Sequence, residues 1–298
     1  MIFIKRLPKF EYHAPTSLSK ALNLLDKYDG KAKVLAGGTD LLVSMKKREV
    51  LPEHLISLKG IAKLKGIHDE KEGIKIGTLV TLGEIEHSKT IQDKFRVLWD
   101  AVQVMASLQV RNLATIGGNL CSAAPSADTA PPLIVLNASV EIMSSNGKRK
   151  VAVEKFFKGP GESVLKPGEI LTQIMIPNPV KESGGAYLKL MRRAAMDLAQ
   201  VGIAACLSFD SEKGTCKGAK IALGAVGSTP IRALKAEKVL LNQEINETVG
   251  KQAGKIAAQE ANPRSSMRAS KEYRREMIEV LTKRAVMIAY SRIITPAA

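Results

Sequence analysis

Two glycine pairs constrain this chain more than any other feature of its sequence. The longer motif occupies residues 109–128 (QVRNLATIGGNLCSAAPSAD), and the shorter one occupies residues 34–42 (VLAGGTDLL). The longer motif is poor in large apolar side chains, so we do not expect a packed helix or strand throughout it. Adjacent glycines let a backbone adopt positive φ and approach another molecule, and their N–H groups are then free to bind an anion. Two such motifs predict two loops that hold one long polyanionic ligand.

The shorter motif lies between a predicted strand and a predicted helix. The apolar residues at 33–36 favour a short strand, and Thr39 or Asp40 is suitably placed to cap the helix that follows. This order would place backbone amides and a helix N-terminus beside bound phosphate groups. An ordinary tight turn is the alternative, and it would be preferred if the second glycine pair were absent.

Both motifs resemble known flavin-binding loops. The segments AGGTDLL (36–42) and QVRNLATIGGNLCSAAPSADTAPPL (109–133) are similar to the two loops of the FAD-binding subunits of molybdenum hydroxylases, the family of xanthine dehydrogenase and aerobic carbon monoxide dehydrogenase. A later segment, AYLKLMRR (186–193) with Asp197, also matches, so the resemblance covers nearly the whole chain. It implies FAD as the cofactor.

The resemblance also implies an α+β fold with two domains. A two-part FAD-binding domain of the PCMH-type flavoprotein fold is expected at residues 1–178, divided into 1–56 and 57–178. A C-terminal domain with a small antiparallel sheet and three helices is expected at 179–298. The length of 298 residues and the 45% of hydrophobic residues suit this arrangement.

Local patterns predict the individual elements. In the first domain, we expect helices at 17–28, 93–108 and 130–136, a capping box from Thr81 to Glu84, and strands at 54–58, 74–78, 139–143, 148–153 and 169–176. In the second domain, we expect strands at 186–191, 200–209 and 217–226, followed by helices at 231–241, 247–260 and 271–293.

Physical roles follow for the polar residues of the loops. The glycines would supply backbone donors to the FAD pyrophosphate, and Thr39, Thr115 and Asn119 would add side-chain hydrogen bonds. Ionised Asp128 only accepts hydrogen bonds, which suits ribose or ribityl hydroxyls, although it could also cap the following helix. With the neighbouring positions, the expected cofactor-binding set in these loops is Val34, Leu35, Ala36, Gly37, Gly38, Thr39, Asp40, Leu41, Ala114, Thr115, Ile116, Gly117, Gly118, Asn119 and Asp128.

Four further positions enter the expected set through the resemblance. Met105 and Cys121 lie where the family places side chains near the flavin, although both residue types are also common core residues. A reactive Cys121 thiol is not expected, because no histidine is close in sequence. Leu171 and Lys189 lie where the C-terminal half reaches back to the cofactor. An ammonium there would favour an anionic reduced flavin, whereas a lysine on a solvated strand would not.

Composition and missing motifs exclude other classes of protein. The three cysteines form no C-x-x-C and the four histidines are scattered, so we expect neither an iron–sulfur cluster nor a metal-binding site. The net charge of +16 is spread along the chain, aromatic residues are only 4%, and no nucleic-acid motif occurs. A basic surface that meets acidic subunits, or a solvated surface, is therefore favoured over nucleic-acid binding. No Rossmann, P-loop or nucleophile-elbow motif is present. The chain has no long apolar run and no signal peptide, so we expect a cytoplasmic protein without a membrane span.

The expected function is electron transfer within a larger complex, with no catalytic residue of its own. In the family, substrate is hydroxylated at a molybdenum cofactor in a large subunit, and electrons cross two iron–sulfur clusters in a small subunit to FAD. The acceptor would be NAD or a quinone. Both subunits are expected partners in a hetero-oligomer, for which a dimer of heterotrimers is one arrangement. A self-contained FAD-dependent oxidoreductase and a basic binding protein without redox chemistry remain as alternatives.

Overall fold

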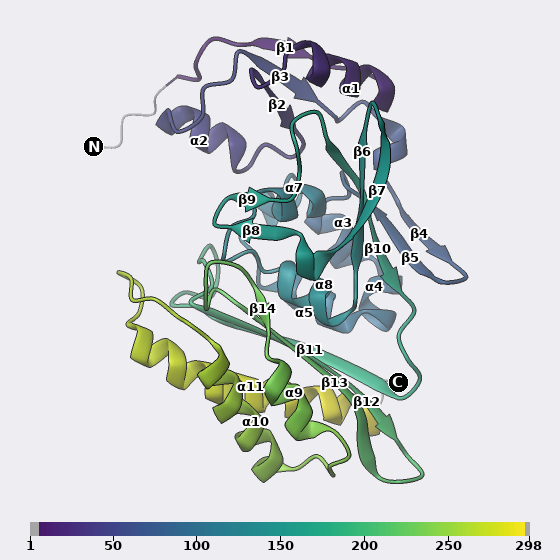
Figure 1. The fold of residues 1–298 in the computed structure, drawn as a ribbon, viewed down its shortest axis with the longest axis vertical. Helices are drawn as coiled ribbons and strands as arrows, with labels where there is room; N and C mark the ends of the chain where they lie inside the picture. The colour runs from purple at the N-terminus through teal and green to yellow at the C-terminus, as the bar shows by residue number, and fades with distance from the viewer. Residues whose placement is uncertain (1–5, 296–298) are drawn as a thin grey trace.

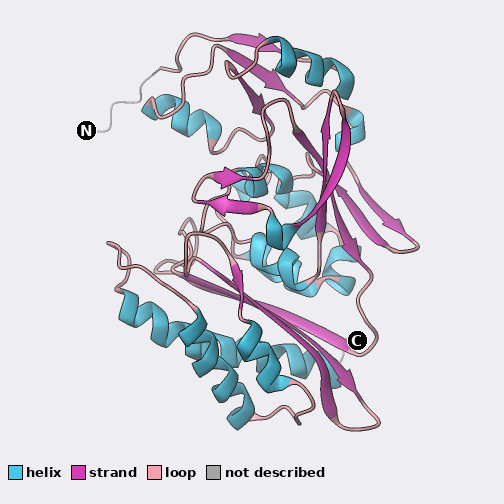
Figure 2. Cartoon of the chain, viewed as in Figure 1, coloured by secondary structure: helices cyan, strands magenta, loops and turns pink. Residues whose placement is uncertain are grey.

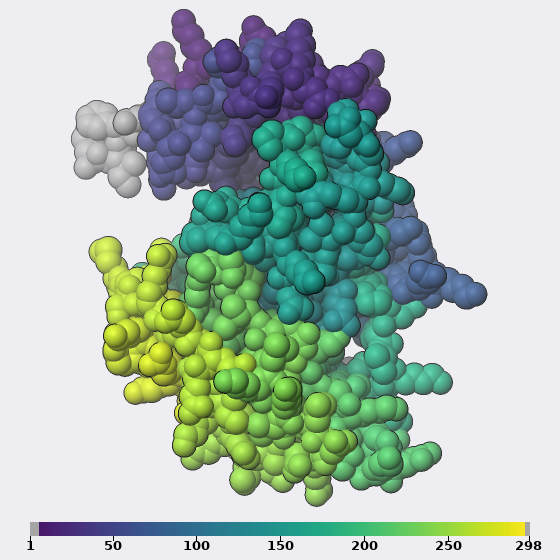
Figure 3. All heavy atoms as spheres, in the orientation of Figure 1, coloured from purple at the N-terminus to yellow at the C-terminus, as the bar shows by residue number. Residues whose placement is uncertain are grey.

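The structure, a computed structural model, describes residues 6–295, and its parts follow one another along the long axis of the molecule (Figure 1). The space-filling view shows the N-terminal residues at one end and the C-terminal helices at the other (Figure 3). The N-terminal part is a three-stranded parallel sheet in the order β1-β3-β2. Its elements are β1 (Glu11–His13), α1 (Leu18–Lys27), β2 (Ala32–Leu35), α2 (Leu41–Lys47) and β3 (His54–Ser57).

The middle part contains a five-stranded antiparallel sheet in the order β4-β5-β10-β6-β7. Helices pack with this sheet around the largest apolar core of the described chain. Its strands are β4 (Ile67–Glu70), β5 (Gly73–Gly77), β6 (Ser139–Ser144), β7 (Gly147–Ala152) and β10 (Ile170–Pro177). Its helices are α3 (Leu82–His87), α4 (Lys89–Lys94), α5 (Arg96–Gln103), α6 (Leu108–Arg111), α7 (Ile116–Cys121) and α8 (Ala130–Val135), with a small hairpin of β8 (Phe157–Gly159) and β9 (Glu162–Ser163).

The C-terminal part is a four-stranded antiparallel sheet in the order β11-β12-β13-β14. Three helices lie along one side of this sheet and share an apolar core with it (Figure 2). The elements are β11 (Ser183–Leu190), β12 (Val201–Asp210), β13 (Thr215–Gly224), β14 (Ile231–Arg232), α9 (Leu234–Leu240), α10 (Glu247–Glu260) and α11 (Lys271–Ile294).

Strand β11 and helix α11 also contact helices of the middle part. Tyr187 of β11 belongs to the same buried cluster as the apolar residues of α5 and α8. Asp100 of α5 accepts hydrogen bonds from Nη1 of Arg292 at 2.6 Å and from the backbone N–H of Tyr187 at 3.2 Å. The two larger parts are therefore joined by apolar packing and by charged hydrogen bonds.

Several local predictions are confirmed. The side chain of Thr81 accepts from the Glu84 N–H while the Glu84 carboxylate accepts from the Thr81 N–H, which is the expected capping box at the start of α3. The hairpin of β6 and β7 turns at Gly147, whose φ of 132° is readily adopted by glycine. The three C-terminal strands and the helices at 247–260 and 271–293 are also present.

Other local predictions are wrong. The helix expected at 93–108 is interrupted at Phe95, whose φ of −129° is not helical, and the segment forms the end of α4, then α5 and the start of α6. The helix expected from residue 231 begins at Leu234, because the preceding residues pair with β13 as strand β14. Asp40 does occupy the N-cap position of α2, but its side chain makes no cap bond there. Thr129 occupies the cap position of α8 that was considered for Asp128.

Candidate cofactor-binding site

The two glycine motifs lie against each other in the fold. The Cβ of any side chain at Gly37 would be 2.2 Å from the carbonyl oxygen of Leu113, so the two backbones approach more closely than any other residue type permits. The hydroxyl of Ser122 donates to the Asp40 carboxylate at 2.7 Å and fastens the end of one motif to the other. The two loops that were predicted separately therefore form one continuous surface.

The first motif presents unpaired backbone donors. Among residues 6–295, no acceptor is found for the N–H groups of Gly37, Gly38, Thr39 and Asp40. Gly38 has a φ of 84°, which turns the chain from β2 towards α2 in a conformation that L side chains rarely adopt. Consecutive free amides at such a turn form a concavity suited to an anion. This motif retains the donors that a pyrophosphate would need.

The second motif has a different role from the one predicted. Its glycines lie in helix α7, neither has positive φ, and their N–H groups are already used by the protein. The Gly117 N–H donates to the Thr78 carbonyl and the Gly118 N–H donates to Oγ1 of Thr115, each at 3.1 Å. A Cβ on Gly117 would lie 1.7 Å from Oγ1 of Thr78. Glycine is required at position 117 for close packing against Thr78, the residue after β5, and the expectation of free amides is wrong here.

Thr115 and Asn119 are partly engaged within the protein. Thr115 caps α7 through the bond to Gly118 and is buried. Oδ1 of Asn119 accepts from the Thr129 hydroxyl at 2.5 Å, which leaves its amide nitrogen without an acceptor in the described part of the chain. Asn119 therefore retains a side-chain donor for a ligand, and its bond to FAD stays a prediction.

Asp128, Tyr187 and Lys189 form a buried network between the two domains. The Tyr187 hydroxyl donates to Oδ1 of Asp128 at 2.7 Å, and Nζ of Lys189 donates to Oδ2 at 2.9 Å and to the Val104 carbonyl at 3.2 Å. The Lys189 side chain is 1% exposed, so the alternative of a lysine on a solvated strand is wrong. Burial raises the pKa of Asp128, while the Lys189 ammonium and the Tyr187 hydroxyl partly offset that effect.

The remaining predicted residues are placed in or beside the core. Met105 and Leu171 are buried among the apolar residues of the middle part. Cys121, at the end of α7, packs against the same core, and burial raises the pKa of its thiol to about 12. A thiol with so high a pKa is a poor nucleophile, which agrees with the expectation that Cys121 is unreactive.

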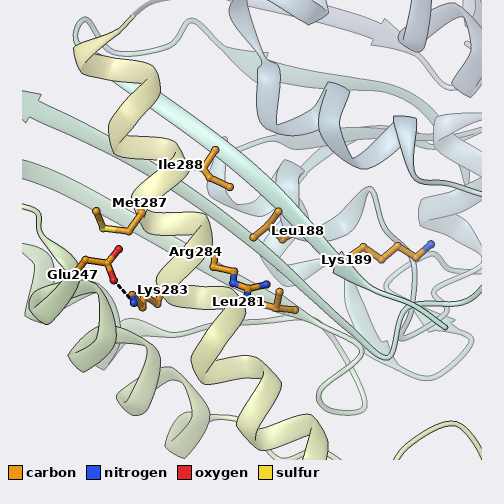
Figure 4. Close-up of a pocket in the computed structure, with 8 residues that line it drawn as sticks. All are labelled: Leu188, Lys189, Glu247, Leu281, Lys283, Arg284, Met287 and Ile288. Atoms are coloured by element: carbon orange, nitrogen blue, oxygen red, sulfur yellow. Dashed lines mark ion pairs between the residues drawn. The ribbon is translucent and has the colours of Figure 1, made fainter. Parts of the chain in front are cut away.

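A separate cavity of about 530 Å³ lies between β11 and the C-terminal helices. Its lining is mainly apolar, with Leu188, Leu281 and Met287 among the contributing side chains, and an ion pair of Lys283 with Glu247 lies beside them (Figure 4). The Lys189 side chain extends away from the other lining side chains (Figure 4). The cavity is distinct from the glycine motifs.

Comparison with known proteins identifies the family. The "FAD binding domain in molybdopterin dehydrogenase" matches residues 8–179, and the "CO dehydrogenase flavoprotein C-terminal domain" matches residues 186–289. The chain belongs to the FAD-binding subunits of the molybdenum hydroxylases. The xanthine dehydrogenase FAD-binding subunit of Escherichia coli O157:H7 is 35% identical over 277 residues, which cover 92% of this FAD-binding subunit and 94% of that protein.

Other relatives of this FAD-binding subunit support the same family assignment. The carbon monoxide dehydrogenase medium chain of Afipia carboxidovorans is 35% identical over 283 residues, covering 95% of this chain and 97% of that one. A structure of carbon monoxide dehydrogenase from Hydrogenophaga pseudoflava matches with a TM-score of 0.93 at 33% identity, covering 96% and 99% of the two chains. Quinoline 2-oxidoreductase from Pseudomonas putida 86 matches with a TM-score of 0.92 at 30% identity, covering 97% and 99%.

These findings confirm the predicted two-domain FAD-binding fold, the FAD cofactor and the oxidoreductase class. The boundary at residue 178 and the individual FAD contacts remain predictions. No helix within residues 6–295 is both long enough and apolar enough to cross a membrane.

Sequence reasoning missed Tyr187, the third member of the buried network. Tyr187 and Lys189 are two residues apart on β11, so their side chains leave the same face of the sheet. That spacing within the segment AYLKLMRR is the signal that could have placed Tyr187 beside Lys189. The Ser122 bond to Asp40 had no comparable signal, because it depends on how the two loops meet.

Proposed function

We propose that this FAD-binding subunit accepts electrons from an iron–sulfur small subunit and delivers them through FAD to an acceptor such as NAD or a quinone. A molybdenum cofactor in a large subunit would hydroxylate the organic substrate. The proposal is supported chiefly by the family match, which extends over both domains of the chain. When it is bound, FAD can transfer electrons between carriers that take one electron and acceptors that take two.

The described residues fit FAD at the first glycine motif. The free N–H groups from Gly37 to Asp40 would hold the pyrophosphate, since they have no other acceptor among the described residues. Close contact of this motif with the segment around Leu113 would keep the loop in place before the cofactor arrives. The free amide nitrogen of Asn119 would add a side-chain donor. This arrangement binds and orients the cofactor without a catalytic side chain.

Asp128 and Lys189 have a positioning role in this proposal. Both Asp128 oxygens already accept bonds from the protein, so any contact with a ribose or ribityl hydroxyl would use a remaining lone pair. Lys189 places a buried positive charge beside the same carboxylate. The proposed set of FAD contacts keeps the positions of the sequence analysis, but Gly117 and Gly118 would contribute close packing and no free amide. These positions are residues 34–41, Met105, residues 114–119, Cys121, Asp128, Leu171 and Lys189.

The partner subunits and the location in the cytoplasm belong to the same proposal. Three of the relatives are named medium chains of carbon monoxide dehydrogenase or glyceraldehyde dehydrogenase, which implies assembly with other chains in those proteins. The net charge of +16 would speed association with acidic faces of partner subunits and make that association sensitive to salt.

Co-purification from the native host tests the proposal. The chain should isolate with subunits that contain iron–sulfur clusters and molybdenum, and the isolated FAD-loaded chain should not oxidise the organic substrate that the complex oxidises. The isolated chain should still exchange electrons with artificial dyes. Substrate turnover by the isolated chain would contradict the proposal and support a self-contained oxidoreductase.

A further inference from the structure

Strands β1 and β3 bring together three potential metal ligands that are distant in sequence. Glu11 and His13 lie two residues apart on β1 and so share one face, and the parallel register places His54 of β3 opposite Glu11. One ligand atom from each of the three side chains lies within 4.8 Å of the others. The sequence indicated scattered histidines, because 41 residues separate His13 from His54.

The three atoms form a nearly regular triangle. Nε2 of His13 is 3.2 Å from Nδ1 of His54, and Oε2 of Glu11 is 3.3 Å from that Nδ1 and 3.8 Å from that Nε2. Tetrahedral zinc with bonds of about 2.0 to 2.1 Å holds neighbouring donor atoms about 3.3 Å apart. Two edges of the triangle therefore match one face of a zinc coordination tetrahedron, and the edge between Glu11 and His13 is longer, at 3.8 Å.

The two imidazole rings are held in position by a third ring. Tyr28 stacks on His54 with ring centroids 3.6 Å apart and an interplanar angle of 16°, and it also stacks on His13 at 5.1 Å. The histidine side chains are only 20% and 12% exposed, whereas Glu11 is 70% exposed. Both nitrogen donors are thus fixed before a ligand arrives, and the carboxylate lies on the solvent side.

We propose that Glu11, His13 and His54 bind one divalent transition-metal ion, with zinc as the best match. Two imidazoles and a carboxylate are zinc ligands, while magnesium and calcium prefer oxygen donors alone. The exposed side of Glu11 leaves the fourth coordination position to water. The alternative is a hydrogen bond between the two histidine rings. It would explain the 3.2 Å distance between their nitrogens, but it would not involve the Glu11 carboxylate.

The ion would fasten the start of the chain to the N-terminal sheet. Strand β1 has only three residues and pairs on one side, with β3. Coordination across β1 and β3 would supply the fixation that such a short edge strand lacks. The cluster lies at the end of the molecule opposite the C-terminal sheet, and its residues are separate from the glycine motifs (Figure 1).

Zinc titration of the untagged, FAD-loaded full chain tests this site. After removal of metal with a chelator, calorimetry should show one saturable zinc per chain. Replacement of His13 or His54 by Ala should weaken that binding by at least about tenfold. The chain has four histidines in all, so His68→Ala and His87→Ala provide matched controls that should bind as the wild type does.

The residues that coordinate the metal can also be identified in the wild-type protein. X-ray absorption of the zinc-loaded wild type should show two imidazole ligands and no sulfur, and Co²⁺ in place of zinc should give the spectrum of a tetrahedral site. Glu11→Gln, which keeps the shape of the side chain, should weaken binding while flavin content is unchanged. The absence of saturable binding, sulfur ligation from a cysteine, or unchanged binding by the His13→Ala/His54→Ala double variant would each overturn the proposal.

Discussion

At the scale of single residues, positive φ and free amides coincide at Gly38. Gly214 also has positive φ, 66°, but it lies on the β12–β13 turn where a Cβ would contact nothing within 4 Å. A Cβ on Gly38 would lie 3.1 Å from Cδ1 of Leu35, a tight contact that needs only a small adjustment. Both glycines therefore have positive φ, but only Gly38 lies in the loop that is proposed to bind FAD.

Gly38→Ala should lower the flavin content of the purified protein, while Gly214→Ala should not. Each substitution should also destabilise the fold by about 1 kcal/mol, because alanine resists positive φ. Flavin absorbance per chain, measured beside chemical denaturation, separates the two effects. Equal flavin content in both variants would show that the first glycine motif is not part of the FAD-binding site.

At this scale, the conformation of one glycine could be predicted from the sequence, but the reason that another glycine is needed could not. Gly38 was expected at positive φ, and the structure confirms it. Gly117 was expected to free an amide, yet it is needed because Thr78 lies where a Cβ would be. Glycine in a sequence cannot distinguish a conformational need from a packing need, because the neighbour that decides is distant in the chain.

At the scale of elements, β7 is fixed to the segment before β10 by Arg149 and Glu169. Nε and Nη2 of Arg149 donate to the two Glu169 oxygens at 2.8 and 2.7 Å, and the Lys166 N–H donates to the same carboxylate at 2.7 Å. These bonds, first that of Arg149, lower the pKa of Glu169. The folded state thus favours the charged carboxylate.

Glu169→Gln should destabilise the protein at neutral pH by about 1 kcal/mol, a value discounted for the partial exposure of the pair. Since the pKa is lowered on folding, the contribution is complete above the unfolded value of about 4.3. It disappears as pH falls through the folded pKa. Denaturation of both proteins from pH 7 to 3 should show the stability difference shrinking in acid, and a constant difference would refute the assignment.

The packing of α10 on α11 depends on one glycine of a pair. A Cβ on Gly254 would lie 2.3 Å from the carbonyl oxygen of Glu279, whereas a Cβ on Gly250 would make ordinary contacts of 3.5 Å with Lys283 and Met287. Both glycines lie inside the same helix and face the same partner. Only Gly254 is required by the approach of the two backbones.

Gly254→Ala should therefore lower the free energy of unfolding by about 1 to 3 kcal/mol through overpacking. Gly250→Ala should be neutral or stabilising by up to about 1 kcal/mol, since alanine favours the helix. Thermal or urea denaturation of the two variants gives the comparison. A larger loss in Gly250→Ala would contradict the packing described for α10.

Elements were predicted best where one pattern extended over the whole segment. The apolar periodicity of α10 and α11 was sufficient, but the same periodicity also continued through Phe95 and concealed the end of α4. Apolar spacing describes which face is buried. It does not reveal that the chain changes direction while keeping that face inside.

At the scale of the whole molecule, the Asp128–Lys189 pair joins the central loop to β11. Asp128→Ala should cost about 3 to 5 kcal/mol of stability, because it leaves a buried ammonium with only the Val104 carbonyl. Lys189→Met should be milder, since burial already raises the pKa of Asp128 and the carboxyl can take up a proton.

Two comparisons make this prediction specific. The double variant Asp128→Ala/Lys189→Met should recover part of the loss, whereas Asp93→Ala, which removes an exposed pair with Lys89, should change stability by less than about 1 kcal/mol. Urea denaturation measures all four. Additive losses in the double variant would show that the two charges do not compensate each other.

The same ion pair constrains the order in which the protein matures on the ribosome. Asp128 is translated before Lys189. The Asp128 carboxylate of the nascent FAD-binding domain therefore has no Lys189 counterion until β11 has been synthesised. We therefore expect flavin loading to follow the emergence of the second domain from the ribosome.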